Sequence, residues 1–70
     1  MDFKTVGILC DNYKVEKFKQ ELIDNGFMNY FIMPSTKTLS HIQVKCLVED
    51  YHKIAKICQS VESYFKIQKN

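Results

Sequence analysis

Apolar residues recur at every second position in some stretches of this chain and at every third or fourth position in others. This change of period constrains the fold more than any other feature of the sequence. It predicts a strand over 4–10, a helix over 13–24, strands over 27–33 and 39–48, and a helix over 50–67. The order is that of a split βαβ unit without its final strand. Because too few residues follow the second helix to supply that strand, we expect one edge of the sheet to be open.

Size and composition indicate one globular domain, spanning 1–70, with a small core. Apolar residues make up 46% of the chain and charged residues 26%, which is ordinary for a folded protein. No apolar run approaches the ~20 residues needed to cross a bilayer, and the N-terminus lacks the layout of a signal peptide. We therefore expect a cytoplasmic protein with no membrane contact. Free thiols are also expected, because Cys10, Cys46 and Cys58 are odd in number and form no CxxC pair.

Alternation within the strands predicts which side chains face the helices. These are Val6, Ile8 and Cys10 in the first strand, and Ile42, Val44, Cys46 and Val48 in the third. Residues 27–33 are apolar on both faces, so alternation alone does not decide between them. Because the polar Asn29 belongs to one set, we expect the other set to be buried, namely Met28, Tyr30 and Ile32.

Both helices are predicted to be amphipathic. Their buried stripes comprise Val15, Phe18, Leu22 and Ile23 in the first helix, and Ile54, Ile57, Cys58, Val61 and Phe65 in the second. Asp11 and Asn12 are expected to cap the first helix, and Gly26 to end it in a left-handed conformation. Lys14 is placed on the solvent side of this helix. The second helix is expected to carry the exposed ion pairs Glu49–Lys53 and Glu62–Lys66.

Packing rules extend this reading to a topology. A right-handed crossover makes the first two strands parallel with a gap between them, and the third strand fills the gap. The prediction is an α+β domain with a three-stranded sheet in the order 1-3-2 and both helices on one face. This arrangement resembles the ferredoxin-like fold, found in ACT-type regulatory domains and RNA-recognition motifs, without its last strand. The resemblance is one of topology, with no family motif behind it, so it assigns no role to any residue.

Catalytic and metal chemistry have little support in the sequence. The available soft metal ligands are Cys10, His41, Cys46, His52 and Cys58, and none of them is paired at the close spacing typical of zinc sites. A nucleophilic pair of Cys10 and His41 is disfavoured because the two side chains are assigned to opposite sheet faces. No phosphate-binding glycine loop or other catalytic motif is present. We therefore expect neither an enzyme nor a bound cofactor or metal ion.

Association with another protein is the function that the pattern favours. The first strand is expected to form the open edge, and residues 4–9 carry one charge and no proline to protect it from pairing. Gly7 would let a second backbone approach closely. The candidate interaction surface comprises this edge and the open sheet face, namely Thr5, Gly7, Leu9, Phe31, His41, Gln43 and Lys45. The expected partner is a second copy of the chain or an unknown protein, as for a small regulator or an inhibitor encoded by a phage or other mobile element.

Two alternatives stay open beside this prediction. An open sheet face can stack single-stranded nucleic acid, but Phe31 is the one central aromatic here, Phe27 lies at the rim, and the RNP signature is absent. All ten basic residues are lysine, which argues mildly against specific base readout. We therefore expect any nucleic-acid binding to be weak. The resemblance to ACT domains implies the second alternative, a sensor that binds a small ligand at a dimer interface.

Overall fold

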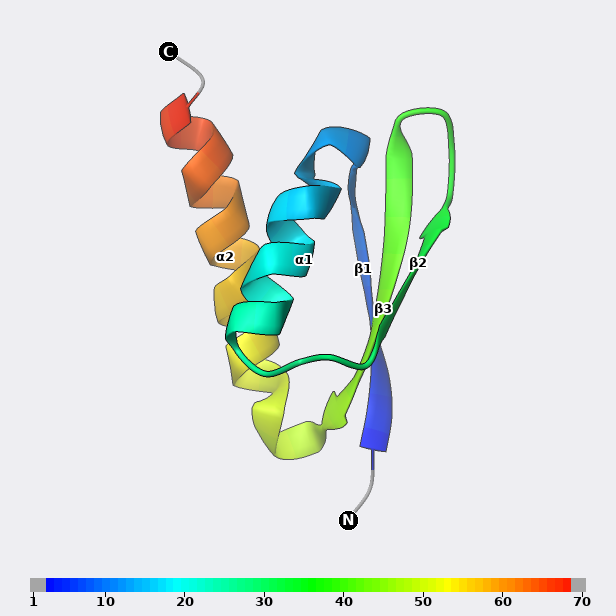
Figure 1. The fold of residues 1–70 in the computed structure, drawn as a ribbon, viewed down its shortest axis with the longest axis vertical. Coiled ribbons are helices and arrows are strands. Elements are labelled where there is room, and N and C mark those ends of the chain that lie inside the picture. Colours follow the sequence, from blue (N-terminus) through cyan, green and yellow to red (C-terminus); the bar gives the residue numbers. More distant parts are fainter. Residues whose placement is uncertain (1–2, 69–70) are drawn as a thin grey trace.

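The computed structural model describes residues 3–68, which form three strands and two α-helices (Figure 1). The strands are β1 (Phe3–Asp11), β2 (Tyr30–Pro34) and β3 (Leu39–Leu47). The helices are α1 (Val15–Asp24) and α2 (Tyr51–Gln68). A single 3₁₀ turn precedes each helix, η1 (Asn12–Lys14) before α1 and η2 (Val48–Asp50) before α2. The predicted order of strands and helices is therefore confirmed.

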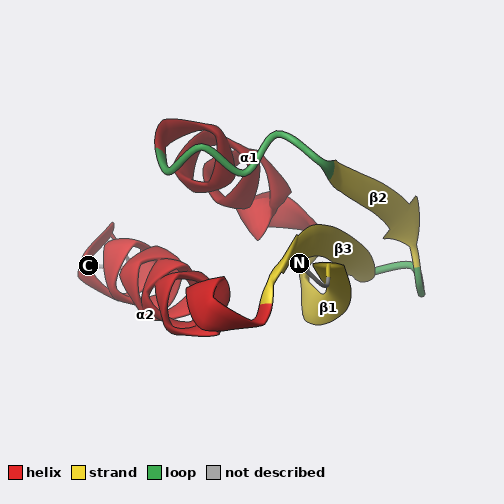
Figure 2. Cartoon of the chain, turned by 90° about the horizontal axis from the view of Figure 1, so that it is seen from below, coloured by secondary structure: helices red, strands yellow, loops and turns green. Residues whose placement is uncertain are grey.

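The sheet is antiparallel, and β3 lies in the middle with β1 on one side and β2 on the other. β1 pairs with β3 along its whole length, from Phe3 opposite Leu47 to Asp11 opposite Leu39. β2 pairs with the other side of β3 over only five residues. Both helices lie on the same side of the sheet, which leaves the other face uncovered (Figure 2). The predicted strand order 1-3-2 and the open sheet are both confirmed.

The core lies between the two helices and the covered face of the sheet. Phe18 and Leu22 of α1 and Val61 of α2 are at most 2% exposed. The full set of buried apolar residues is Ile8, Cys10, Phe18, Leu22, Phe27, Ile42, Val44, Cys46, Ile54, Ile57 and Val61. Alternation therefore gave the correct inward faces for β1 and for β3 up to Cys46. In β2, Tyr30 and Ile32 pack against this core as predicted.

The prediction was wrong at the start of the second strand. The strand begins at Tyr30 rather than at residue 27, and Phe27 is buried while Met28 is 67% exposed. The cause is the end of α1, where Gly26 takes a φ of 85° as expected. The N–H of Gly26 then donates to the carbonyl of Ile23 at 3.0 Å, and that of Phe27 to the carbonyl of Leu22 at 2.8 Å. These two bonds form a Schellman motif, and Phe27 and Leu22, the positions that usually make its apolar contact, both belong to the core.

Two further apolar assignments were wrong for a related reason. Val48 is 52% exposed because β3 ends at Leu47 and the chain turns into η2, which stops the alternation one residue before Val48. Ile23 is 43% exposed and lies beside the buried stripe of α1 rather than within it. Both residues lie at or near the end of a strand or helix. The regular backbone stops there, so the spacing of buried residues no longer applies.

The predicted charge pairs also differ from those in the structure. Lys14 is buried instead of solvent-facing, and its ammonium group binds Glu62, so Glu62 is not paired with Lys66. Lys53 binds Asp50 at 3.5 Å rather than Glu49. Neither of the two predicted pairs is present among residues 3–68.

The predicted cap of the first helix is absent as well. Asp11 precedes η1 without a side-chain cap hydrogen bond. The side chain of Asn12 instead donates to the carbonyl of Lys37 at 2.8 Å and accepts a hydrogen bond from the hydroxyl of Ser40. Asn12 therefore fastens the end of β1 to the β2–β3 hairpin rather than capping a helix.

Candidate protein-binding surface

The outer flank of β1 presents unpaired backbone groups. The N–H of Lys45 donates to the carbonyl of Asn29 at 2.9 Å, so Lys45 directs its backbone groups away from β1. Because these directions alternate along an antiparallel strand, the even-numbered residues of β3 are the ones that bond to β1. In β1 their partners are also even-numbered, from Lys4 to Cys10. The odd-numbered residues of β1 therefore point their N–H and C=O groups outward, namely Phe3, Thr5, Gly7, Leu9 and Asp11.

This flank has few of the features that keep strand edges from pairing. β1 is nine residues long, contains no proline, and carries Lys4 as its one basic side chain. Long edges with few charges accept further strands. The other edge of the sheet is different, since β2 has five residues and ends at Pro34, which cannot donate a hydrogen bond. Of the two edges, β1 is the one suited to receive a partner strand.

The open sheet face brings all seven predicted surface residues together. Thr5 lies opposite Lys45, Gly7 opposite Gln43, and Leu9 opposite His41. On the far side of β3, Phe31 also lies opposite Gln43. The seven positions therefore form one continuous patch across the three strands. A shallow hollow of about 210 Å³ lies on this patch and is lined by Thr5, Asn29, Tyr30, Phe31, Gln43 and Lys45.

Apolar side chains on this patch are left in contact with solvent. Leu9 and Phe31 are each 60% exposed. Phe3 is equally exposed and shares the odd-numbered positions of β1, so it belongs to the same face. Phe3 was missed because the predicted strand began at residue 4, and the same alternation continued one step back would have included it. Phe27, which was predicted at the rim of this face, is instead part of the core.

Gly7 does not have the role that the sequence suggested for it. The imidazole of His41, from the neighbouring strand β3, lies directly above it on the open face. A Cβ atom at position 7 would be 2.7 Å from Nε2 of His41, which is closer than van der Waals contact allows. The space above Gly7 is therefore filled by the chain's own histidine. The absent side chain leaves room for the Nε2 end of the His41 imidazole, and an incoming strand must approach Gly7 from the side, along its backbone.

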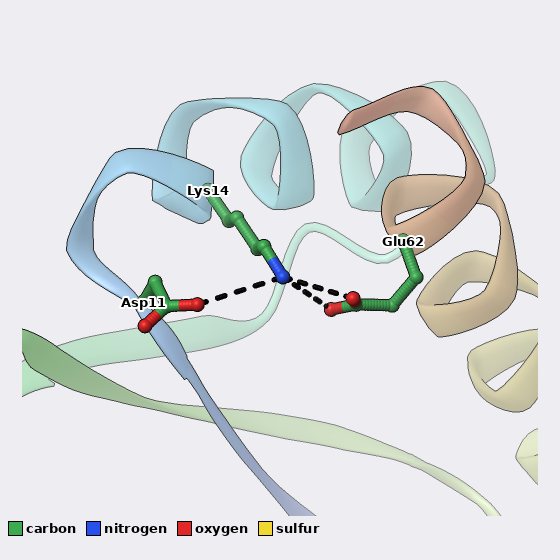
Figure 3. Close-up of polar contacts among 3 residues, drawn as sticks. All are labelled: Asp11, Lys14 and Glu62. Carbon is green, nitrogen blue, oxygen red and sulfur yellow. Dashed lines mark hydrogen bonds and ion pairs between the residues drawn. The ribbon is translucent and has the colours of Figure 1, made fainter. Parts of the chain in front are cut away.

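A larger groove of about 650 Å³ lies at the opposite side of the molecule, between η1 and α2. Its floor holds an internal ion pair, in which Nζ of Lys14 lies 2.9 Å from Glu62 and 3.5 Å from Asp11 (Figure 3). The hydrogen bond to Glu62 raises the pKa of Lys14 above its ordinary value, although desolvation opposes the shift. Tyr13 and Phe65 form one wall, with their rings edge to face at 5.2 Å. The charges of Lys14 and Glu62 are paired within the chain, and this contact holds η1 against α2.

The cysteines are placed as small apolar side chains. Burial raises the pKa of Cys10, Cys46 and Cys58, so the reactive thiolate form is disfavoured at neutral pH. Cys10 faces the helices whereas His41 lies on the open face, so the two do not form a nucleophilic pair. Within residues 3–68, no three side chains of the His, Cys, Asp and Glu types gather closely enough to hold a metal ion.

In the described part of the chain, neither helix has the length and apolar character required to cross a membrane. Comparisons with models of protein families, with curated proteins and with solved structures give no match to this chain.

Proposed function

We propose that this chain is a small, non-enzymatic protein-binding module that docks a partner along the outer flank of β1, next to the open sheet face. The observation that carries the proposal is the row of outward-facing amide groups on a nine-residue strand without proline. In β-strand addition, backbone hydrogen bonds of this kind supply the affinity. The exposed side chains of Phe3, Leu9 and Phe31 supply apolar area beside the edge.

Such a module acts by binding its target rather than by catalysing a reaction. A regulator or inhibitor of this kind binds a strand or edge of its target and blocks or organises it. Successive side chains of the partner strand would point in turn to the helix side and to the open side of the extended sheet. Every second residue of the partner therefore contacts the same face and can contribute to specificity. On the open side, a partner strand would contact Thr5 and Leu9, which flank the His41 imidazole.

The proposal is tested by replacing Thr5 with proline. The N–H of Thr5 points outward, so Thr5→Pro removes a docking donor while leaving the bonds between β1 and β3 intact. Lysate from the source cells is passed over immobilised wild type, Thr5→Pro, and the surface variant Glu16→Gln. The expected result is a protein retained by wild type and Glu16→Gln but lost with Thr5→Pro, while the circular dichroism of all three is unchanged. Retention of the same proteins by folded Thr5→Pro would contradict docking at this edge.

Single-stranded nucleic acid is the second candidate, favoured by two exposed aromatic rings, Phe3 and Phe31, on a face that also carries Lys45. Aromatic rings beside a lysine can stack bases and contact phosphate. Binding of this kind weakens steeply as salt rises, because counterions are released from the strand. Docking along a strand edge depends much less on salt. Fluorescence anisotropy of a labelled oligonucleotide at low and high salt therefore separates the two candidates.

A further inference from the structure

We infer that the strand received by the β1 edge is β1 of a second copy of this chain, in antiparallel register about a two-fold axis at Gly7. The inference rests on the proposed function, since it names the partner of the same edge. The product would be a six-stranded sheet in the order β2-β3-β1-β1-β3-β2. All four helices would lie on one face, and the two open faces would join into one surface. An interface of this kind uses the same patch on both copies, as two-fold symmetry requires.

The length of β1 sets the register. The strand runs from Phe3 to Asp11, and Gly7 is its middle residue. Complete overlap of the strand with its own antiparallel copy therefore places Gly7 opposite Gly7, and Thr5 opposite Leu9. The outward-facing residues are the odd-numbered ones, and in this register each of them meets another odd-numbered residue. Every free N–H then faces a free C=O, which gives up to about ten hydrogen bonds between the copies.

The side chains on the helix side of the edge fit the same register. Val6 lies opposite Ile8 of the second copy, and the pair occurs twice because of the symmetry. Val6 already packs against the core and Ile8 belongs to it, so the two pairs extend the apolar layer across the interface. Lys4 lies opposite Cys10 of the second copy, and Asp11 lies opposite Phe3. The pairing thus sets no two like charges opposite each other.

The open side of the edge also accepts this pairing. At the two-fold axis, the two glycines contribute no Cβ atoms to the crossing. The atoms nearest to the missing Cβ of each Gly7 belong to His41 of its own chain, whose imidazole occupies the space above the strand rather than the flank beside it. On either side of the axis, exposed Leu9 lies next to Thr5 of the second copy, which covers part of its apolar surface.

Cross-linking tests the register with variants on the exposed face. Thr5 and Leu9 of the second copy would have Cα atoms about 5.5 Å apart, within the range that a disulfide spans. Two Thr5 residues would be about 13 Å apart, as would two Leu9 residues, which is too far. A mixture of Thr5→Cys and Leu9→Cys chains should therefore form a covalent dimer under mild oxidation. Either variant alone, and the wild type with its own three cysteines, should not.

Light scattering supplies the second measurement. The full chain is expected to give about twice the 8.3 kDa mass of a single copy at high micromolar concentration. Thr5→Pro should weaken dimerisation by at least about tenfold, while Glu16→Gln, on α1, should leave it unchanged. Cross-linking of Thr5→Cys or Leu9→Cys alone would overturn the Gly7 register, and a dimer unaffected by Thr5→Pro would place the interface elsewhere.

A clean monomer at all concentrations would overturn the inference itself. The proposed function would still stand in that case if the Thr5→Pro substitution abolished capture of another protein. It would fail together with the inference if neither self-association nor capture depended on Thr5.

Discussion

The ammonium group of Lys14 lies 2.9 Å from both carboxylate oxygens of Glu62, a residue 48 positions further along the chain. This contact joins η1, which directly follows β1, to α2. The side chain of Lys14 is 11% exposed and that of Glu62 is 61% exposed, so the pair is only partly shielded from water. It therefore stabilises the packing of α2 without the full desolvation cost of a buried pair.

Removing the charge of Glu62 should measurably lower the stability of the fold. Glu62→Gln keeps the shape of the side chain but weakens its hydrogen bonds to Lys14, and we expect the free energy of unfolding to fall by about 1 kcal/mol. For a domain of this size the melting temperature should drop by roughly 4–8 °C. Glu16→Gln is the matched control, because the pair of Glu16 with Lys19 is exposed and should contribute only a few tenths of a kcal/mol. Equal effects of the two substitutions in thermal unfolding would contradict the assigned role of the Lys14–Glu62 pair.

Stability should decrease at alkaline pH. Burial raises the pKa of Cys10 and Cys46 above the ordinary 9.0, so the folded chain keeps these protons to higher pH than the unfolded chain does. Between the two pKa values the native state binds more protons, and the free energy of unfolding falls as pH rises. The raised pKa of Lys14 acts in the same direction at still higher pH. Urea unfolding under reducing conditions should show lower stability at about pH 10 than at about pH 7.5; unchanged or higher stability would be inconsistent with buried thiols.

The contact of His41 with Gly7 predicts that the effect of Gly7→Ala on the free energy of unfolding depends on whether His41 is present. In the wild type, Gly7→Ala forces the imidazole to move, since the new Cβ would lie 2.7 Å from Nε2 of His41, and the substitution should be less favourable than in a chain without the imidazole. In a His41→Ala chain the same space is free. Gly7→Ala should then stabilise the fold by about 0.5 kcal/mol, because alanine restricts the unfolded chain more than glycine does. A double-mutant cycle measures this coupling, and additive effects would mean that His41 does not rest on Gly7.

Phe27 and Met28, two neighbouring residues that follow α1, should differ strongly in how much their replacement by alanine destabilises the fold. Phe27 is buried and Met28 is 67% exposed, although the sequence pattern suggested the reverse. Phe27→Ala should therefore cost about 3 kcal/mol, enough to unfold much of a small domain. Met28→Ala should cost less than about 0.5 kcal/mol. Similar losses of stability for the two variants, measured by denaturant unfolding, would argue against the Schellman motif at Gly26 as the device that buries Phe27.

The sequence predicted the fold well because the fold depends on local periods. Alternation in β1 and β3 and the helical stripes each require only a few consecutive residues, and the crossover rule then fixes the strand order. Errors arose where an element ends, as at Phe27, Val48 and Ile23, since the backbone changes direction there and the period stops. The Schellman contact of Phe27 was available from the Asn25–Gly26 signal, but alternation was extended through it instead.

The candidate surface was predictable in part for the same reason. Its seven residues follow from alternation and strand order, and the structure places them on one face. Two side-chain contacts could not be predicted from the sequence, because each depends on packing between distant segments. One is the position of His41 above Gly7, and the other is the pairing of Lys14 with Glu62. A single sequence carries no periodic signal for either.

Amide hydrogen exchange along β1, recorded in a dilute single-copy sample and again at high concentration, tests the central claim most directly. The N–H groups of Val6 and Ile8 bond to β3 and should exchange slowly in both samples. Those of Thr5, Gly7 and Leu9 should exchange fast when the chain is a monomer and become protected on association. Slow exchange at Thr5, Gly7 and Leu9 in a sample proven to be monomeric would show that the outer flank of β1 is already occupied, and would contradict the account.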